Sequence, residues 1–88
     1  MTKTEEKALW ELLQKQKDIL LLVSQRKEEA VQRWDDNAMM RWAEREAKEE
    51  TILRHYEEVV TALGYKPLWK ADPNNEERMV LTLKKREA

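Results

Sequence analysis

The sequence predicts a mainly α-helical protein, built as an antiparallel, coiled-coil-like helical hairpin followed by a short C-terminal segment. Three observations lead to this fold class. The first 63 of the 88 residues contain no glycine and no proline, the two residue types that most destabilise the interior of a helix. Apolar residues recur there in alternating steps of three and four, and a cluster of capping residues divides the region in two. After residue 63 the apolar residues alternate instead.

The first helix is predicted to span residues 3–34. Thr2 and Glu5 match the capping-box pattern at a helix N-terminus. Heptad spacing of this kind defines a seam that faces another helix. The seam residues are Leu9, Leu13, Gln16, Leu20, Val23, Lys27, Ala30 and Trp34. Two of these are polar, so the seam is interrupted.

Asp35-Asp36-Asn37 predicts a turn, because Asp and Asn disfavour helix interiors and favour N-caps. The second helix is then expected at residues 38–63, before Gly64, which fits the left-handed position after a helix. Its seam residues are Met39, Trp42, Glu46, Glu49, Leu53, Tyr56, Val60 and Leu63. Folding back at the turn brings Leu9 near Leu63 and Lys27 near Glu46. Residues 1–63 would thus form a helical hairpin, and the alternative is one continuous helix paired with another chain.

The C-terminal tail, residues 64–88, predicts a β-hairpin packed on the helices. Met79, Leu81 and Leu83 alternate with other residues as in a strand. Residues 67–70 provide an antiparallel partner, and residues 72–75 (Asp-Pro-Asn-Asn) provide a turn between the two. A third helix, capped by Asp72 with Pro73 in its first turn, is the alternative.

Composition argues against an enzyme and against a bound cofactor or metal. The chain has no cysteine, and His55 and Ser24 are its only histidine and serine. Few residues could therefore serve as a catalytic nucleophile and its general base. One glycine cannot form a phosphate-binding loop. No signal-peptide pattern and no apolar run of ~20 residues is present. We therefore expect a cytoplasmic protein that binds no membrane.

Aliphatic residues occupy every position from Ile19 to Val23, which is more than a single partner helix can cover. Four tryptophans in so short a chain add residues that are typical of protein interfaces, although they also fill small cores. We expect a protein-binding or self-association face containing Trp10, Ile19, Leu21, Leu22, Met39, Met40, Trp42 and Trp69. The predicted function is a small adaptor, chaperone or inhibitor, either a homodimer or bound to another protein.

Several stretches of the helical region are similar to flagellar export chaperones of the FlgN type. They are the Leu-rich residues 9–13, the aliphatic residues 19–23, Lys-x-x-Ala-Val at 27–31, the acidic pair Asp35-Asp36 and the Glu-rich residues 44–50. This resemblance covers residues 5–63 and implies a long antiparallel helical hairpin that binds export substrates. The family has a further C-terminal helix that takes the substrate, whereas this chain ends in a predicted β-hairpin. No substrate-binding residue can therefore be transferred.

Nucleic acid is an alternative partner. Helix residues 51–63 followed by a basic hairpin at residues 66–85 resemble the second half of a winged helix-turn-helix. The candidate contacts are Arg54, Lys66, Lys70, Arg78, Lys84 and Lys85. A net charge of -1 disfavours this reading, because nucleic-acid-binding domains usually carry a basic excess. The acids at Glu44, Glu46, Glu49 and Glu50 would also repel phosphate.

Overall fold

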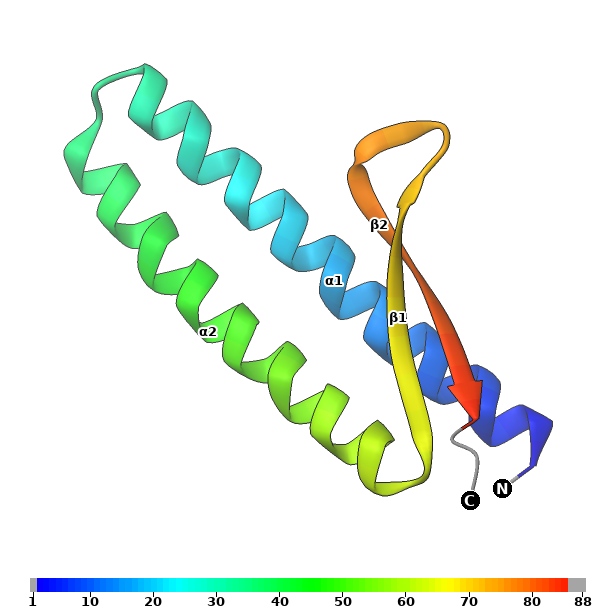
Figure 1. Ribbon diagram of the computed structural model, residues 1–88. Helices are drawn as coiled ribbons and strands as arrows, with labels where there is room; N and C mark the ends of the chain where they lie inside the picture. Colours follow the sequence, from blue (N-terminus) through cyan, green and yellow to red (C-terminus); the bar gives the residue numbers. More distant parts are fainter. Residues whose placement is uncertain (1, 86–88) are drawn as a thin grey trace.

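A computed structural model describes residues 2–85 and shows two long antiparallel helices followed by a two-stranded β-hairpin (Figure 1). The elements are α1 (Lys3–Gln32), α2 (Asp36–Ala62), β1 (Tyr65–Asp72) and β2 (Asn75–Lys85). The predicted helical hairpin with a C-terminal β-hairpin is confirmed, and the tail forms strands rather than a third helix. Met1 and residues 86–88 of the predicted tail lie outside the described residues.

The helix ends follow the predicted capping chemistry. The Thr2 hydroxyl accepts a hydrogen bond from the backbone N–H of Glu5 at 3.2 Å, and the Asp35 carboxylate accepts one from Ala38 at 3.0 Å. These bonds satisfy backbone donors that a helix leaves free in its first turn. At the other end of α2, Gly64 has φ +94°, the left-handed conformation in which glycine is unstrained. The chain can therefore turn sharply from α2 into β1.

The predicted seam forms the contact between the helices. Its buried apolar residues are Leu13, Val23 and Ala30 of α1 and Leu53 and Val60 of α2. Most of the remaining apolar seam residues are half-buried around them.

Two polar pairs also connect the helices across the seam. The buried Gln16 side chain donates hydrogen bonds to the carboxylate and the backbone carbonyl of Glu49. The Lys27 ammonium lies 2.7 Å from one carboxylate oxygen of Glu46, and Ser24 donates to the other oxygen at 2.6 Å. The predicted approach of Lys27 to Glu46 is thus confirmed, and the interruptions of the seam are paired rather than left unsatisfied.

Two predicted seam residues lie outside the seam. Trp34 is 90% exposed with φ +59°, because α1 ends at Gln32 and the chain leaves the helical path two residues before it. Leu63 is half-exposed, because it is the C-cap of α2 and no longer follows helical spacing. The turn is also displaced, since α2 begins at Asp36 with Asp35 as its N-cap rather than at residue 38.

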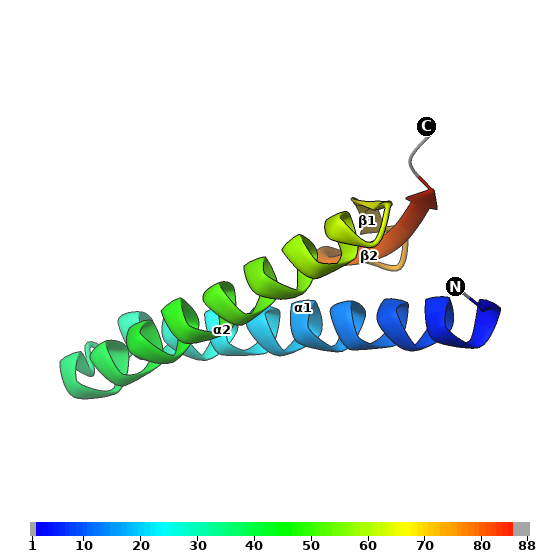
Figure 2. The same cartoon turned by 90° about the horizontal axis from the view of Figure 1, so that it is seen from below.

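The β-hairpin lies on one side of the helix pair, as Figure 2 shows. Its strands pair antiparallel, with Trp69 opposite Leu81 and Pro67 opposite Leu83. Tyr65 and Leu81 are buried in one cluster with the seam residues Leu13, Leu53 and Val60. A two-stranded hairpin is marginal by itself, so this shared core holds it to the helices.

The side chain of Gln14 on α1 also holds the hairpin to the helices, through two hydrogen bonds to the backbone of β2. Its amide donates to the Met79 carbonyl at 2.9 Å and accepts from the Leu81 N–H at 2.8 Å. These are the two backbone bonds that a neighbouring strand would make with β2. The indole N–H of Trp10 donates to the Leu81 carbonyl at 2.7 Å. The outer edge of β2 is therefore hydrogen-bonded to side chains of α1 at Met79 and Leu81.

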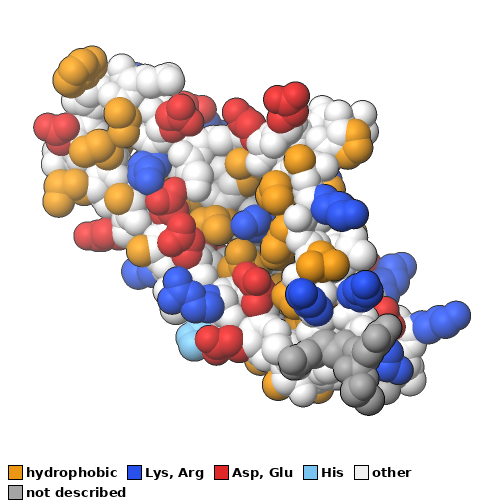
Figure 3. All heavy atoms as spheres, in the orientation of Figure 1, with side chains coloured by type: hydrophobic (Ala, Val, Ile, Leu, Met, Phe, Trp, Pro, Cys, Tyr) orange, Lys and Arg blue, Asp and Glu red, His pale blue; other side chains and the backbone are white. Residues whose placement is uncertain are grey.

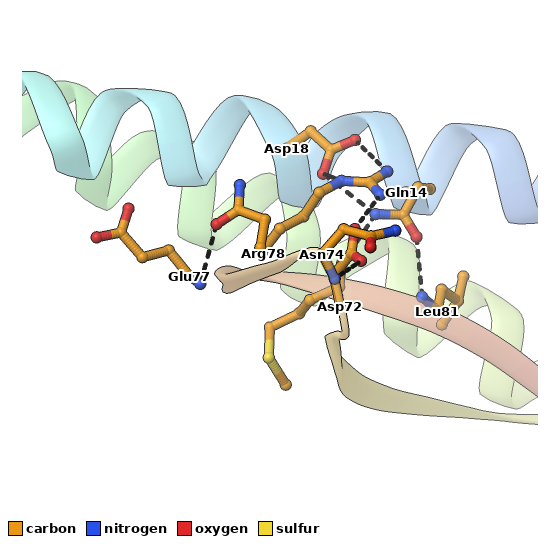
Figure 4. A network of polar contacts seen from close by, with 9 residues as sticks. Gln14, Asp18, Asp72, Asn74, Glu77, Arg78 and Leu81 are labelled. Atoms are coloured by element: carbon orange, nitrogen blue, oxygen red, sulfur yellow. Dashed lines mark hydrogen bonds and ion pairs between the residues drawn. The ribbon is translucent and has the colours of Figure 1, made fainter.

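A second polar attachment lies at the hairpin turn (Figure 4). The Arg78 guanidinium forms a forked pair of hydrogen bonds with Asp18 of α1, at 3.0 and 3.1 Å, and a third bond with Asp72 at 3.1 Å. The backbone N–H of Asn74 and the Arg78 guanidinium lower the pKa of Asp72. Planar, two-point pairing of this kind fixes orientation as well as distance.

Replacing Gln14 should loosen the hairpin. Gln14→Ala leaves the backbone groups of Met79 and Leu81 unpaired, so we expect a loss of about 2 kcal/mol in unfolding free energy, measured by urea denaturation. Gln25→Ala is the matched control, because Gln25 makes one exposed bond to Glu77. An equal loss in both variants would contradict the role assigned to Gln14.

The conformation of Trp34 predicts a second stability difference. A residue with a Cβ in the left-handed region is strained by ~1–2 kcal/mol, whereas glycine is not. Trp34→Gly should therefore be about 1 kcal/mol more stable than Trp34→Ala. Urea denaturation of the two variants tests this difference, and an Ala variant as stable as the Gly variant would show that position 34 carries no strain.

Candidate interaction surface

The side of the helix pair opposite the hairpin is covered by no element among residues 2–85 (Figure 2). On both helices it is formed by the residues that precede the seam residues by one position. In an antiparallel pair these two rows lie on the same side, because a shift of one residue rotates 100° about each helix axis. We call this the uncovered face. Its residues on α1 and its C-cap are Ala8, Leu12, Lys15, Ile19, Leu22, Arg26, Glu29 and Arg33, and those on α2 are Ala38, Arg41, Arg45, Lys48, Ile52, His55, Val59 and Ala62, with the C-cap residue Leu63 beside them.

One half of the uncovered face is apolar. Leu12, Val59 and Leu63 are 44%, 53% and 51% exposed. A shallow hollow of about 630 Å³ is lined by Ala8, Leu9, Leu12 and Leu63, with Glu5 at its rim. This hollow confirms the predicted proximity of Leu9 and Leu63. Contiguous exposed apolar side chains of this size are typical of interaction sites.

The other half of the uncovered face, toward the turn, is basic. A hollow of about 460 Å³ on α2 is lined by Arg41, Trp42, Arg45 and Lys48, together with Ala38 and Glu44. Arg26 adds a cation from α1, and Lys15 lies farther from the turn, between Leu12 and Ile19. The seventeen positions of the face hold six Lys or Arg side chains and one Glu, although the whole chain has 17 basic and 18 acidic residues. Basic residues therefore outnumber acidic residues on this face.

Some of these cations have carboxylate partners. Arg45 pairs with Glu49 at 2.8 Å, and Arg26 pairs with Glu29 at 3.1 Å. Lys15, Arg41 and Lys48 form no ion pair with any carboxylate in the described part of the chain. Three cations of the uncovered face are thus available to carboxylates of a partner.

The hairpin side has a different character. Figure 3 shows acidic side chains along α2 and basic side chains over the hairpin, with hydrophobic side chains gathered near the turn between the helices. Charges of both signs therefore face solvent on this side. The two sides of the helix pair therefore differ in the charges that they expose. This difference arises from the fold and cannot be read from the net charge of the chain.

The structure divides the eight predicted interface residues among three places. Ile19 and Leu22 lie on the uncovered face, and Leu22 is exposed. Met39 and Met40 lie near the turn, with Met40 exposed and Met39 half-buried, and the half-buried Trp42 lines the basic hollow of the uncovered face. The remaining three residues, all half-buried, are Trp10, Leu21 and Trp69.

Trp10 and Trp69 make contacts within the chain rather than facing solvent freely. Both pack against the buried core, and the Lys17 ammonium lies 5.2 Å from the centre of the Trp69 ring. They are therefore poor members of a free interface, because the hairpin docks on α1 and α2 through them.

Sequence reasoning missed Leu12, Val59, Leu63 and the basic row. A signal was present, since Leu12 and Ile19, like Ile52 and Val59, are seven residues apart. Lys15 and Lys48 interrupt these rows, so a search for apolar spacing alone does not detect them. Near the turn the predicted interface residue Met40 is exposed, and the exposed residues Val31 and Trp34 were not predicted to belong to an interface.

Five of the six candidate nucleic-acid contacts lie on the hairpin, where Lys66 is opposite Lys84. Arg78 is held by Asp18 and Asp72, which raise its pKa and neutralise its charge. Arg54 is exposed on α2, and the exposed lysines of the hairpin are Lys66, Lys70, Lys84 and Lys85. Among residues 2–85, no three His, Asp or Glu side chains are placed to hold one metal ion. No described helix has a stretch long and apolar enough to cross a membrane.

Comparisons with known proteins leave this surface unassigned. No protein-family model matches the chain, and neither a curated protein nor a solved structure shows significant similarity to it.

Two carboxylates in the seam have lowered pKa values. Hydrogen bonds from Gln16 and then Arg45 lower the pKa of Glu49 from its ordinary value of 4.5. Hydrogen bonds from Lys27 and then Ser24 lower the pKa of Glu46. A group with a lower pKa in the folded state stabilises the fold above its unfolded pKa and loses this contribution as pH falls.

Unfolding free energy should therefore decrease as the pH is lowered below about 5. Replacing both carboxylates, as in Glu46→Gln with Glu49→Gln, should reduce stability at pH 7 and flatten this dependence. Urea denaturation between pH 7 and pH 3 measures both effects. The control, Glu58→Gln, removes an exposed carboxylate that contacts His55, and an equally flattened profile in that variant would contradict the role of the seam pair.

Proposed function

We propose that this protein is a non-enzymatic protein-binding module that acts through its uncovered face, as a small adaptor, chaperone or inhibitor. The observation that supports this function most is the exposure of Leu12, Val59 and Leu63 on a helix face that no described element covers. Two antiparallel helices present a groove along their length, and a third helix packed into it would complete a bundle.

Burial of this patch supplies a physical reason for binding. Fully burying a Leu or Val side chain stabilises by about 1.5–3 kcal/mol. Leu12, Val59 and Leu63 are already about half-buried, so their complete burial would contribute about 2–4 kcal/mol together. Ile19 and Ile52, both half-buried on the same face, extend the contact. The flagellar export chaperones that the helices resemble are one example of the proposed class.

The proposal is tested by comparing captured proteins. Wild type, Leu12→Glu with Val59→Glu, and Met40→Glu would each be immobilised in lysate of the source organism. Captured proteins would be cross-linked and identified by mass spectrometry. We expect proteins that wild type and Met40→Glu capture and that the double variant loses, because Met40 is exposed outside the uncovered face.

Circular dichroism would first establish that all three proteins keep the same helix content. If the double variant captures the same proteins as wild type, or if Met40→Glu loses them equally, the uncovered face is not the binding surface. Light scattering at several protein concentrations would show whether wild type binds a second copy of itself.

A further inference from the structure

We infer that the uncovered face takes an acidic amphipathic helix of another protein, rather than a second copy of this chain. This inference rests on the proposed function and adds the chemistry of the partner. It follows from two features of the same face: apolar side chains at helix-packing spacing, and an excess of basic side chains, three of which have no carboxylate partner among residues 2–85.

The spacing of the two features fixes the kind of helix that fits. Val59 at the apolar end and Lys48 in the basic half are eleven residues apart on α2, which is about 16 Å along a helix. From Leu63 to Arg41 the face extends over about 33 Å. A partner helix of about 20 residues would cover this length. Its apolar residues would recur every three or four positions, and its carboxylates would lie toward the turn of this protein.

The unpaired cations of the uncovered face indicate that the partner is acidic. Lys15, Arg41 and Lys48 have no carboxylate partner within residues 2–85, so Asp or Glu on a docked helix would pair with them without breaking an existing ion pair. Carboxylates do line the hollows around these cations, with Glu44 beside Arg41 and Lys48, and Glu11 and Asp18 beside Lys15, but none of them forms an ion pair with these three residues. Complementary charge of this kind raises association rates and excludes partners of the wrong sign.

The same charges disfavour a second copy on this face. Two uncovered faces packed together would bury two sets of six Lys or Arg side chains with one Glu in each set, so neither copy would supply the carboxylates that the cations of the other need. Like charges brought together in an interface are destabilising. The expected homodimer, if it forms, should therefore use another surface.

Nucleic acids and anionic membranes also attract basic surfaces, but the apolar half of the face favours a helix. Leu12, Val59 and Leu63 have no counterpart on a phosphate backbone, which is bound through Lys and Arg. The two heptad rows run along antiparallel helices, which is the arrangement that accepts a third helix with regular packing. Binding to duplex DNA or to vesicles therefore serves as an opposing outcome in the test.

The probes are two synthetic 21-residue helical peptides with blocked ends and Leu at the a and d positions of each heptad. One carries Glu at the flanking positions and the other carries Lys. Binding of each labelled peptide would be followed by fluorescence anisotropy at low and high salt. We expect one Glu peptide per protein chain, with an affinity at least tenfold above that of the Lys peptide and weaker at high salt.

Variants assign the binding to the face. Arg41→Glu with Lys48→Glu should weaken the Glu peptide at least tenfold. Lys66→Glu with Lys70→Glu makes the same charge change on the hairpin and should alter its affinity less than twofold. Leu12→Glu with Val59→Glu should abolish binding of both peptides.

Four outcomes would overturn the inference. They are equal affinity for the two peptides, no binding of either, an equal loss in the hairpin control, or tighter Arg41- and Lys48-dependent binding of duplex DNA or phosphatidylserine vesicles. If charge reversal has no effect but Leu12→Glu with Val59→Glu still loses the captured proteins, the acidic partner is wrong and the protein-binding function stands. If that double variant still captures the same proteins as wild type, the proposed function itself fails.

Discussion

The register of the two helices depends on the polar pairs in their seam. Gln16 is bonded to the buried Glu49, and Lys27 to Glu46, from opposite helices. Sliding one helix by a turn would separate Glu49 from Gln16 and leave a buried carboxylate with fewer donors, which is strongly unfavourable. Apolar seam residues alone would tolerate such a slip more easily. With the register fixed, the residues preceding the seam meet on one side, and the uncovered face exists as a continuous surface.

The β-hairpin and the helix pair stabilise each other. A chain of 88 residues has a small core, and a two-stranded hairpin is marginal alone. Tyr65 and Leu81 add to the cluster of Leu13, Leu53 and Val60, so one core serves both parts. Because the hairpin occupies one side of the pair, the apolar residues on the opposite side remain exposed. The fold thereby leaves one face available while remaining held together on the other.

Features that repeat along the chain could be predicted from the sequence, whereas single long-range contacts could not. Heptad spacing located Leu13, Val23, Leu53 and Val60, and alternation located the strands. Gln14 and Arg78 belong to no repeat, so their bonds to β2 and to Asp18 have no sequence signal. Spacing also misplaced Trp34, because a left-handed conformation at a residue other than glycine is set by the turn and not by its own preference.

The hydrogen bonds between α1 and the edge of β2 limit the addition of further strands to this sheet. Because the Leu81 N–H points to Gln14, the opposite residue Trp69 directs its backbone groups to the open edge of β1. Pro67, on the same edge, has no N–H to offer. A fibril built from added strands needs two open edges on every molecule. In this hairpin the edge of β2 is already bonded at Met79 and Leu81, and the edge of β1 is interrupted at Pro67, so both edges oppose the continuous strand addition that a fibril requires.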